Sequence, residues 1–483
     1  MKLGDIVKDC GVIRIVGDPG IEINAVCNDS RKVSGGALFA AVRGCGNDGH
    51  AYIDSAVSRG ASAILCEEGA TVPEGVTAVF CKSSKRAVAM AADAFYGHPS
   101  GKLELVGITG TNGKTTTVTM LYNLFRSLGY ECGLLSTIAN YIGSEKRETA
   151  NTTSDPVTMN ALLAEMVNRG CSFCFMEVSS IGLEQERVAG LEFRAGIFSN
   201  LTHDHLDYHK TFSEYLRCKK LFFDGLGKDA VAIINTDDRN AEIMVQNCAA
   251  KVVRYSCKNP ADHKCRIVEQ GVEGMMLRVD GKEMWTSLIG AHNAYNILAV
   301  YCTAVELGVA PDEALLHISA LKAAKGRLET LHGPRKVSVV IDYAHTPDAL
   351  ENVLSALKEV APERQLVCLF GCGGDRDHSK RPEMAAVACK YADRIIITSD
   401  NSRSEDPESI IAEIRTGLDL AGRARTISIT DRKEAIRTAI ITCEEGAIVL
   451  LAGKGHEDYQ IDANGKHHFS EHEIVNEIFK SLS

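Results

Sequence analysis

The chain has 483 residues, of which 45% are hydrophobic and 24% charged, a balance typical of soluble globular proteins. A net charge of −10 without a long basic run argues against a nucleic-acid groove, so we expect local loops to hold any anionic substrate. This length is sufficient for about two to four domains.

The 17 cysteines are scattered and odd in number, and most lie inside apolar runs such as 63–66. That distribution is typical of small hydrophobic side chains in a reducing compartment. Cys171 and Cys174 form a C-x-x-C pair, but no second pair lies nearby, so core packing is favoured over a metal or redox role. We find neither a signal peptide nor a membrane-length apolar stretch, and therefore expect a cytoplasmic protein without membrane insertion.

The first part of the chain, residues 1–98, alternates strand and helix patterns. The apolar run within 35–44 predicts a buried strand, 52–59 a helix and 61–66 a second strand. This alternation predicts a small α/β domain, with a linker at 98–101.

The most informative stretch is 107–117, which reads Gly-Ile-Thr-Gly-Thr-Asn-Gly-Lys-Thr-Thr-Thr. It follows an apolar run and precedes helical spacing, and this strand–loop–helix context is typical of a phosphate-binding loop. Backbone N–H groups of such a loop and the helix N-terminus bind phosphate, Lys114 would reach the outer phosphates, and Thr115 would bind Mg²⁺. Ile108 stands where the usual motif has its first glycine. A plain strand-to-helix turn explains the glycines but not the Lys-Thr pair after them.

Two further segments of the second part, 99–330, carry candidate ligands. A buried strand predicted at 172–178 places Glu177 at its carboxyl end, where open α/β sheets bind ligands. Glu177 is therefore a candidate Mg²⁺ ligand, and an ordinary strand-end charge is the alternative. Residues 203–209 contain three histidines and two aspartates, which suit Mg²⁺ beside a nucleotide better than zinc because they follow a strand.

A helical pattern at 215–222 turns one of its two lysines, Lys219 or Lys220, inward with the apolar stripe. Such a position is unusual for lysine. Burial among cationic neighbours favours the neutral amine and would free it for chemistry. A lysine that extends its ammonium back to solvent is the alternative.

From residue 331 to residue 483 the chain again alternates strands and helices. Each predicted strand runs into a cluster rich in Gly, Asp and Arg. One such cluster can be explained by the residues that loops ordinarily contain. Four clusters at equivalent places indicate a doubly wound, Rossmann-like sheet whose ligand-binding edge is formed by these loops. The strands are predicted at 337–341, 366–370, 394–398 and 447–452, and their clusters lie at 342–347, 371–377, 400–403 and 453–457.

Together these motifs resemble those of the Mur ligases, ATP-dependent amide ligases of peptidoglycan synthesis. The resemblance implies an α/β protein of three domains. Residues 1–98 would bind the UDP end of the substrate, 99–330 would form the central P-loop-type ATPase domain with a mainly parallel sheet, and 331–483 would bind the amino acid. The resemblance rests on 109–116, 177–180, 204–209, 292–293, 326–327, 342–347 and 453–459.

Within the family, the chain is similar to members that add the third peptide residue. The similarity implies that ATP phosphorylates the D-glutamate γ-carboxylate of UDP-N-acetylmuramoyl-L-alanyl-D-glutamate, and that the amine of meso-2,6-diaminopimelate attacks the acyl phosphate. Arg403 favours diaminopimelate, because lysine-adding relatives lack this arginine. Two departures from the family are Ile181 in place of a histidine and Ser402 in place of a proline.

Three alternatives remain at this stage: an L-lysine-adding Mur ligase, a folylpolyglutamate-synthase-like ligase, and, from a different class, an ATP-hydrolysing P-loop switch protein. The match across the first domain argues against the folylpolyglutamate-synthase-like enzyme. We expect a monomer that acts on small molecules and binds no nucleic acid, with Mg²⁺ as cofactor and ATP as co-substrate. We also expect the third domain to close when substrates bind.

The resemblance further implies the residues of each site. Catalytic roles fall on Lys114, Glu177, His205 and Lys219, and Mg²⁺ ligation on Thr115, Glu177, His205 and Lys219 as its carbamate. The implied ATP-binding residues are Gly110, Thr111, Asn112, Gly113, Lys114, Thr115, Thr116, Asn296, Arg327 and Asp342. Those implied for the muramoyl dipeptide are Ser30, Cys45, Gly46, Asn47, Asn151, Thr152, Thr153, Ser179, Gln185 and Arg187. Those implied for diaminopimelate are Arg376, Asp400, Asn401, Ser402, Arg403, Gly453 and Glu457.

Overall fold

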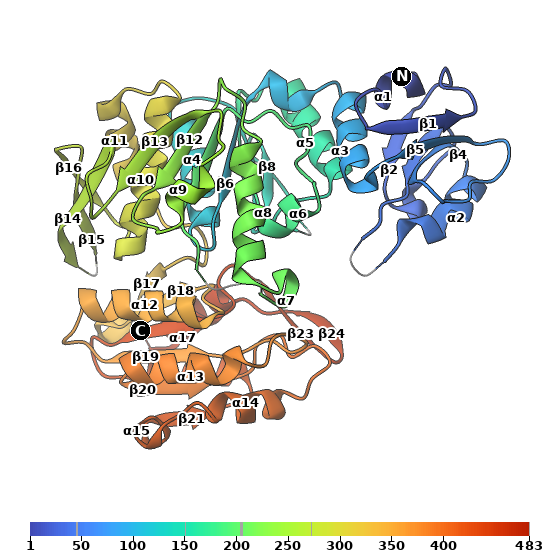
Figure 1. Cartoon of the computed structure of the whole chain (residues 1–483). Helices are drawn as coiled ribbons and strands as arrows, with labels where there is room; N and C mark the ends of the chain where they lie inside the picture. Colours follow the sequence, from blue (N-terminus) through green and yellow to red (C-terminus); the bar gives the residue numbers. More distant parts are fainter. Residues whose placement is uncertain (45–46, 150, 203–205, 272, 483) are drawn as a thin grey trace. The chain divides into compact units, whose positions relative to one another are not determined.

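The computed structural model describes residues 1–44, 47–149, 151–202, 206–271 and 273–482, which form helices and sheets throughout (Figure 1). The chain divides into two compact units, and each is described by itself. The first comprises Met1–Leu201, Tyr208–Tyr255 and Cys302–Leu307, and the second Thr202–Asp207, Ser256–Tyr301 and Gly308–Ser483. Three main α/β sheet regions confirm the predicted fold class.

The N-terminal sheet has the strand order β1-β5-β4-β3-β2, with β2 to β5 parallel and β1 antiparallel to β5. Helices α1 and α3 pack on one face and α2 on the other, so the predicted small α/β domain is present. The strands are β1 (Val12–Val16), β2 (Ala25–Cys27), β3 (Ala37–Ala40), β4 (Ala61–Glu67) and β5 (Thr77–Cys81), and the helices α1 (Leu3–Ile6), α2 (Ile53–Ser58) and α3 (Ser84–Phe95). Short 3₁₀ turns η1 (Ser30–Lys32), η2 (Gly49–Tyr52) and η3 (Pro99–Lys102) connect these elements.

Strand β6 (Glu104–Thr109) lies inside the second sheet of the first unit, in the order β13-β12-β11-β6-β10-β7-β8-β9. The pairs from β13 through β7 are parallel, whereas β8 and β9 add an antiparallel edge. This confirms the mainly parallel central sheet. The other strands are β7 (Cys132–Leu135), β8 (Asn140–Ile142), β9 (Glu145–Arg147), β10 (Phe173–Glu177), β11 (Ala195–Phe198), β12 (Val231–Asn235) and β13 (Lys251–Ser256).

Several helices of this region begin at a residue whose side chain accepts a backbone hydrogen bond. Asp155 accepts hydrogen bonds from two backbone N–H groups at the start of α5, and Pro156 occupies its first turn. Thr211 caps α8 in the same way. The helices are α4 (Lys114–Ser127), α5 (Pro156–Asn168), α6 (Ser180–Glu184), α7 (Leu206–His209), α8 (Phe212–Asp224) and α9 (Ala241–Met244).

The second unit contains an antiparallel meander followed by two helices. Its strands are β14 (His263–Gly271), β15 (Gly274–Val279) and β16 (Lys282–Thr286), and the helices are α10 (Ala291–Glu306), which continues into the first unit, and α11 (Pro311–Ser319). None of the helices built by the described residues combines the length and hydropathy of a membrane span.

The C-terminal sheet has the order β17-β18-β22-β19-β20-β21 and is parallel except at β17. Helices α12, α13 and α14 pack on one face, and α16 and α17 on the other, which confirms the doubly wound prediction. The strands are β17 (Glu329–His332), β18 (Ser338–Asp342), β19 (Leu366–Phe370), β20 (Arg394–Ile397), β21 (Thr426–Ser428), β22 (Ile448–Ala452) and the hairpin β23 (Tyr459–Asp462) and β24 (Gly465–His468). The helices are η4 (Pro334–Lys336), α12 (Pro347–Val360), α13 (Lys380–Tyr391), α14 (Pro407–Arg415), α15 (Leu420–Ala424), α16 (Arg432–Thr442) and α17 (Glu471–Leu482).

The C-terminal core provides a direct test of this packing. Leu369 is fully buried on β19, whereas Leu420 on α15 is 87% exposed. We predict that Leu369→Ala loses about 2–5 kcal/mol of stability, because a cavity forms between the sheet and its helices. Leu420→Ala, the matched control, should change stability by no more than about 0.5 kcal/mol. Calorimetry of the full chain measures both, and equal melting temperatures for the two variants would contradict the assigned core.

Candidate functional site

The predicted phosphate loop connects β6 to α4 and is held by residues that follow β11. Gly110 and Gly113 have positive φ values of 151° and 88°, which side chains other than glycine rarely adopt. A Cβ atom on Gly110 would lie 1.9 Å from the hydroxyl of Ser199. The amide of Asn112 donates to the side chain of Asn200 at 2.9 Å. The loop therefore depends on two residues, Ser199 and Asn200, to which the sequence analysis assigned no role.

Two lysines converge on one carbonyl of this loop. The ammonium of Lys114 donates to the carbonyl oxygens of Gly110 at 2.9 Å and Thr111 at 2.8 Å. Lys219 donates to the same Gly110 oxygen at 2.8 Å and is 1% exposed. Lys220, the other candidate on α8, instead forms an ion pair with Asp224. The structure thus places Lys219, rather than Lys220, on the inward face of the helix.

Glu177 lies buried at the carboxyl end of β10, as predicted. Its carboxylate accepts the Thr115 hydroxyl at 2.9 Å, the Thr137 amide at 2.8 Å and the Thr137 hydroxyl at 3.2 Å. Thr137 was not predicted, because nothing in the sequence distinguishes a loop threonine that contacts a carboxylate. The candidate His205 lies outside the described residues. Among the described residues, no group of three or more His, Cys, Asp and Glu side chains is arranged to hold a metal.

The candidates for the dipeptide end of the substrate gather beside Glu177. Thr153 donates its hydroxyl to the Glu177 carbonyl and accepts the Ser179 amide, both at 2.9 Å. Arg187 donates to the Thr153 carbonyl at 2.6 Å and to the side-chain oxygen of Gln185. These residues form one hydrogen-bonded group around the end of β10.

Other dipeptide candidates are more scattered. Thr152 accepts the Thr137 hydroxyl at 3.1 Å, whereas Asn151 is exposed. Ser30 begins η1, and Asn47 accepts the hydroxyl of Tyr52 at 3.2 Å. Cys45 and Gly46 lie outside the described residues.

Three candidates for nucleotide contact belong to the second unit. Asn296 is buried on α10 and donates to the side chain of Asn293 at 3.0 Å. Asp342 accepts backbone N–H bonds from Leu328 and Ala344, both at 2.8 Å. Burial raises the pKa of Asp342, although Arg327 opposes this shift. Asp342 therefore fixes the 326–328 turn, and Arg327 in this turn lies over the Tyr343 ring at 5.0 Å.

The predicted amino-acid loops after β20 and β22 are joined by a buried lysine. The side-chain amide of Asn401 donates to Glu457 at 2.8 Å and its oxygen accepts Lys454 at 3.1 Å. Lys454 is fully buried and also pairs with Glu457 at 3.2 Å. The sequence predicted a binding cluster at 453–457 but assigned no role to Lys454 within it.

Arg403 is held by its backbone and by one guanidinium nitrogen. Its φ of 53° lies in the left-handed region, and its Nη1 donates to the carbonyls of Gly374 at 2.8 Å and Asn401 at 3.3 Å. Arg376 is exposed and donates to the carbonyl of Asp375. Ser402, which replaces the family proline, is buried. The site thus contains two arginines on adjacent loops, one of them fixed.

Asp400 carries a negative charge in this buried setting. Burial by itself raises its pKa, but Lys454, Arg432 and the Asn401 amide outweigh burial and hold the pKa below its ordinary value. A Cβ atom on Gly453 would lie 2.7 Å from the Asp400 carboxylate. Only glycine at position 453 therefore permits the two loops to approach this closely.

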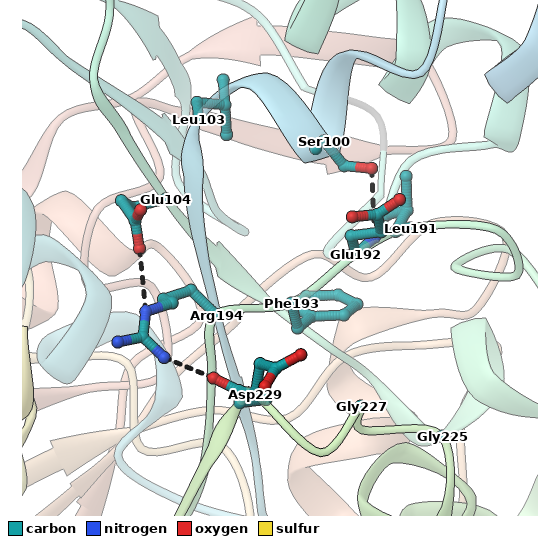
Figure 2. Close-up of a pocket in the computed structure, with 12 residues that line it drawn as sticks. Ser100, Leu103, Glu104, Leu191, Glu192, Phe193, Arg194, Gly225, Gly227 and Asp229 are labelled. Carbon is teal, nitrogen blue, oxygen red and sulfur yellow. Dashed lines mark hydrogen bonds and ion pairs between the residues drawn. The ribbon is translucent and has the colours of Figure 1, made fainter. Parts of the chain in front are cut away.

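A cavity of about 460 Å³ opens elsewhere in the first unit, at the amino ends of β6, β11 and β12 (Figure 2). Arg194 in its wall pairs with Glu104 at 3.2 Å and donates to the Asp229 carbonyl. Because the phosphate loop follows the carboxyl end of β6, this cavity lies at the opposite edge of the sheet. It contains none of the predicted site residues.

Comparisons with known proteins agree along the whole chain. Three family descriptions match: "Mur ligase family, catalytic domain" at residues 22–118, "Mur ligase middle domain" at 108–304 and "Mur ligase, glutamate ligase domain" at 326–455. Proteins named UDP-N-acetylmuramoyl-L-alanyl-D-glutamate--2,6-diaminopimelate ligase from Cytophaga hutchinsonii and Bacteroides fragilis are 46% and 49% identical, with 100% and 99% of both chains covered. A solved structure with the same name has a TM-score of 0.72 and 30% identity, covering 100% of this chain and 99% of that chain.

The phosphate loop yields a prediction for Lys114. Replacing Lys114 by alanine should reduce ATP-dependent turnover by roughly a hundredfold or more, because the cation at the loop is lost. Stability should change little, since the ammonium meets two loop carbonyls and not the core. Turnover and melting temperature are measured together, with exposed Lys146→Ala as the control. An active Lys114→Ala enzyme would contradict the ATP assignment.

Proposed function

The chain belongs to the Mur ligase family, and from this premise we propose that it adds meso-2,6-diaminopimelate to UDP-N-acetylmuramoyl-L-alanyl-D-glutamate, using ATP, in peptidoglycan synthesis. The observation that carries the proposal is the full-length similarity to relatives named for this reaction. The arrangement of charged side chains in both units supports it. The substrates are small molecules, and a monomeric state and cytoplasmic location remain predictions.

The chemistry requires activation, because a carboxylate at neutral pH has no leaving group. The γ-carboxylate oxygen of D-glutamate attacks the γ-phosphorus of ATP, giving an acyl phosphate and ADP. The diaminopimelate amine then attacks the acyl carbon, loses a proton and expels inorganic phosphate, which leaves an amide. Catalysis of such steps consists mostly of positioning and of neutralising charge between two anions.

The phosphate loop supplies this neutralisation. Lys114 already lies across the loop on the Gly110 and Thr111 carbonyls, and from there its ammonium would turn to the outer phosphates. Backbone N–H groups of residues 113–116, at the N-terminus of α4, would donate to the remaining phosphate oxygens. Asn296, Arg327 and Asp342 are proposed to contact the rest of the nucleotide.

The oxygen atoms beside this loop are suited to bind Mg²⁺. The Thr115 hydroxyl and the Glu177 carboxylate lie 2.9 Å apart, and hard oxygen donors of this kind are the ligands that Mg²⁺ prefers. Together with His205 and a carbamylated Lys219 they would hold the ion. When bound, Mg²⁺ neutralises phosphate charge. Thr137 would keep the Glu177 carboxylate oriented through its two hydrogen bonds.

The muramoyl dipeptide would bind along the group around the end of β10. Arg187 is the cation of this group, and its contacts with Thr153 and Gln185 fix the guanidinium for a substrate carboxylate. Asn151, Thr152 and Ser179 would add neutral donors. Ser30 and residues 45–47 are proposed for the uridine end.

Selection of diaminopimelate over L-lysine is assigned to the loop of Arg403. Diaminopimelate carries a carboxylate beside its distal amine, and lysine does not. The Nη1 atom of Arg403 donates to two carbonyls. The edge of the guanidinium away from Nη1 is therefore the one suited to bind a substrate carboxylate. Glu457, Asp400 and Asn401 would receive the distal ammonium, with Gly453 and Ser402 shaping the pocket and Arg376 adding a second cation.

An assay of phosphate release tests the function as a whole. The ligase requires both the UDP-muramoyl dipeptide and an amino acid for release, whereas a P-loop switch protein releases phosphate without either. The L-lysine-adding alternative predicts release with lysine and not with diaminopimelate. Dependence on both substrates, with diaminopimelate preferred, is the expected result.

A prediction concerns Lys219, which we propose is carbamylated. Its neutral amine adds CO₂ and releases a proton, giving an anion that suits Mg²⁺ where an ammonium would repel it. Lys219→Ala should be nearly inactive and partly rescued by short carboxylic acids, whereas the neighbouring Lys220→Ala should remain active. ¹³C-bicarbonate NMR of the wild type should show a carbamate that is absent from Lys219→Ala. A wild type without this resonance under turnover conditions would refute the carbamate.

A second prediction concerns the choice of amino acid. Arg403→Ala should lower kcat/KM for diaminopimelate roughly tenfold to a hundredfold, because a charge-assisted contact is lost. The value for lysine should change much less, and Arg423→Ala, an exposed arginine of the same region, should alter neither. Steady-state kinetics with both amino acids measure this. Efficient use of lysine by the wild type, or unchanged diaminopimelate kinetics in Arg403→Ala, would contradict the assignment.

A further inference from the structure

Arg432 connects the two strands that carry the amino-acid loops. It is fully buried in the first turn of α16, behind the capping residue Asp431. Its Nη1 donates to the Ser399 carbonyl at 3.1 Å and its Nη2 to the Ala452 carbonyl at 2.8 Å. Ser399 and Ala452 directly precede Asp400 and Gly453. In the sheet, β19 separates β20 from β22, so one guanidinium links the ends of two strands that are not neighbours.

The charge of Arg432 is balanced inside the same buried group. Its Nε donates to the carboxylate of Glu471 at 2.9 Å, and Glu471 is 1% exposed at the start of α17. The carboxylate of Asp400 lies 3.9 Å from Arg432 and 3.9 Å from Lys454. Buried ion pairs of this kind are often no more stabilising than packed apolar side chains of similar size. Stability alone therefore gives no reason for a charged pair here, whereas a guanidinium, whose three nitrogens donate in fixed directions, suits two carbonyls and a carboxylate at once.

We propose that Arg432, held by Glu471, is a positioning residue that fixes the distance between the loop of Asp400 and Arg403 and the loop of Gly453 and Glu457. The inference rests on the proposed function, since those two loops form the amino-acid site assigned above. Arg432 itself does not touch the substrate. It acts through the two strand ends.

The spacing of the two loops matters because diaminopimelate would be bound by both of them. The distal carbon of diaminopimelate bears a carboxylate and an ammonium, and Arg403 on one loop and Glu457 on the other would take one group each. A substrate bound at both groups is sensitive to the spacing of the loops, whereas lysine, which lacks the carboxylate, is bound at one. Loss of Arg432 is therefore expected to weaken the binding of diaminopimelate more than the binding of lysine. The selectivity of the site for diaminopimelate falls as a result.

The test uses the full-length enzyme and a pair of substitutions that removes both charges. Arg432→Met alone leaves Glu471 buried without its cation and endangers folding. The double variant Arg432→Met/Glu471→Met removes the pair together and preserves volume. Arg364→Met is the matched control, because Arg364 donates to the carbonyls of Lys336, Gly446 and Ala447 at the amino ends of β18 and β22, at the opposite edge of the same sheet.

We expect KM for diaminopimelate to rise roughly tenfold to a hundredfold in the double variant, since misplacement by about 1 Å has effects of that size. The KM values for ATP and the UDP-muramoyl dipeptide should stay within about twofold, and the diaminopimelate-to-lysine ratio of kcat/KM should fall. Arg364→Met should leave all these values near those of the wild type.

A folded double variant with unchanged diaminopimelate KM and selectivity would overturn the positioning role. An equal rise in all three KM values, or the same changes in Arg364→Met, would also overturn it, because these results indicate general destabilisation. The wild type separates this proposal from the function on which it rests. If the wild type does not use diaminopimelate, the proposed function fails and the positioning role fails with it. A wild type that uses diaminopimelate, together with an unaffected double variant, overturns the positioning role alone.

Discussion

Parallel pairing of β10 and β11 with β6 is the constraint on which the phosphate side of the site depends. In this register Glu177 pairs with Ile108, and Phe198 with Thr109. All three strands therefore end at one edge of the sheet, which places the carboxylate next to the loop after β6. The same pairing explains why Ile108 replaces a glycine of the usual motif: it is a fully buried strand residue, and the tight turn begins only at Gly110.

Both parts of the candidate site use lysine side chains to organise loops at strand ends. Lys114 and Lys219 meet at the Gly110 carbonyl, and Lys454 joins Asn401 to Glu457. A lysine amine can donate to more than one oxygen atom, so each of these side chains links segments of the loops around it. The polar side chains of these sites are therefore positioned before a substrate binds. Positioned donors of this kind favour the binding of anions.

The C-terminal sheet repeats this principle with arginines. Arg381 is fully buried and pairs with Glu405 and Glu413, while donating to the Gly373 carbonyl, so it connects the loops that carry Arg376 and Arg403. Arg432 connects the ends of β20 and β22, which are not neighbours in the sheet. Planar guanidinium groups can donate to several carbonyls in fixed directions, which a lysine cannot do. The loops of a site that distinguishes similar amino acids are thus supported from inside the domain.

The sequence by itself determined the α/β class, the phosphate loop and most strands of the C-terminal sheet. The predicted strand 366–370 coincides with β19, those at 394–398 and 447–452 differ from β20 and β22 by one residue at one end, and that at 337–341 is shifted by one residue from β18. Apolar periodicity and glycine spacing are local properties, so they can be recognised from the sequence alone. The family resemblance selected Lys219 over Lys220, and the structure places Lys219 on the inward face. Only the tertiary structure decided that Thr137 contacts Glu177 and that Arg432 links the ends of β20 and β22. Those contacts join residues distant in the chain, and only the pairing of strands and the packing of helices brings them together.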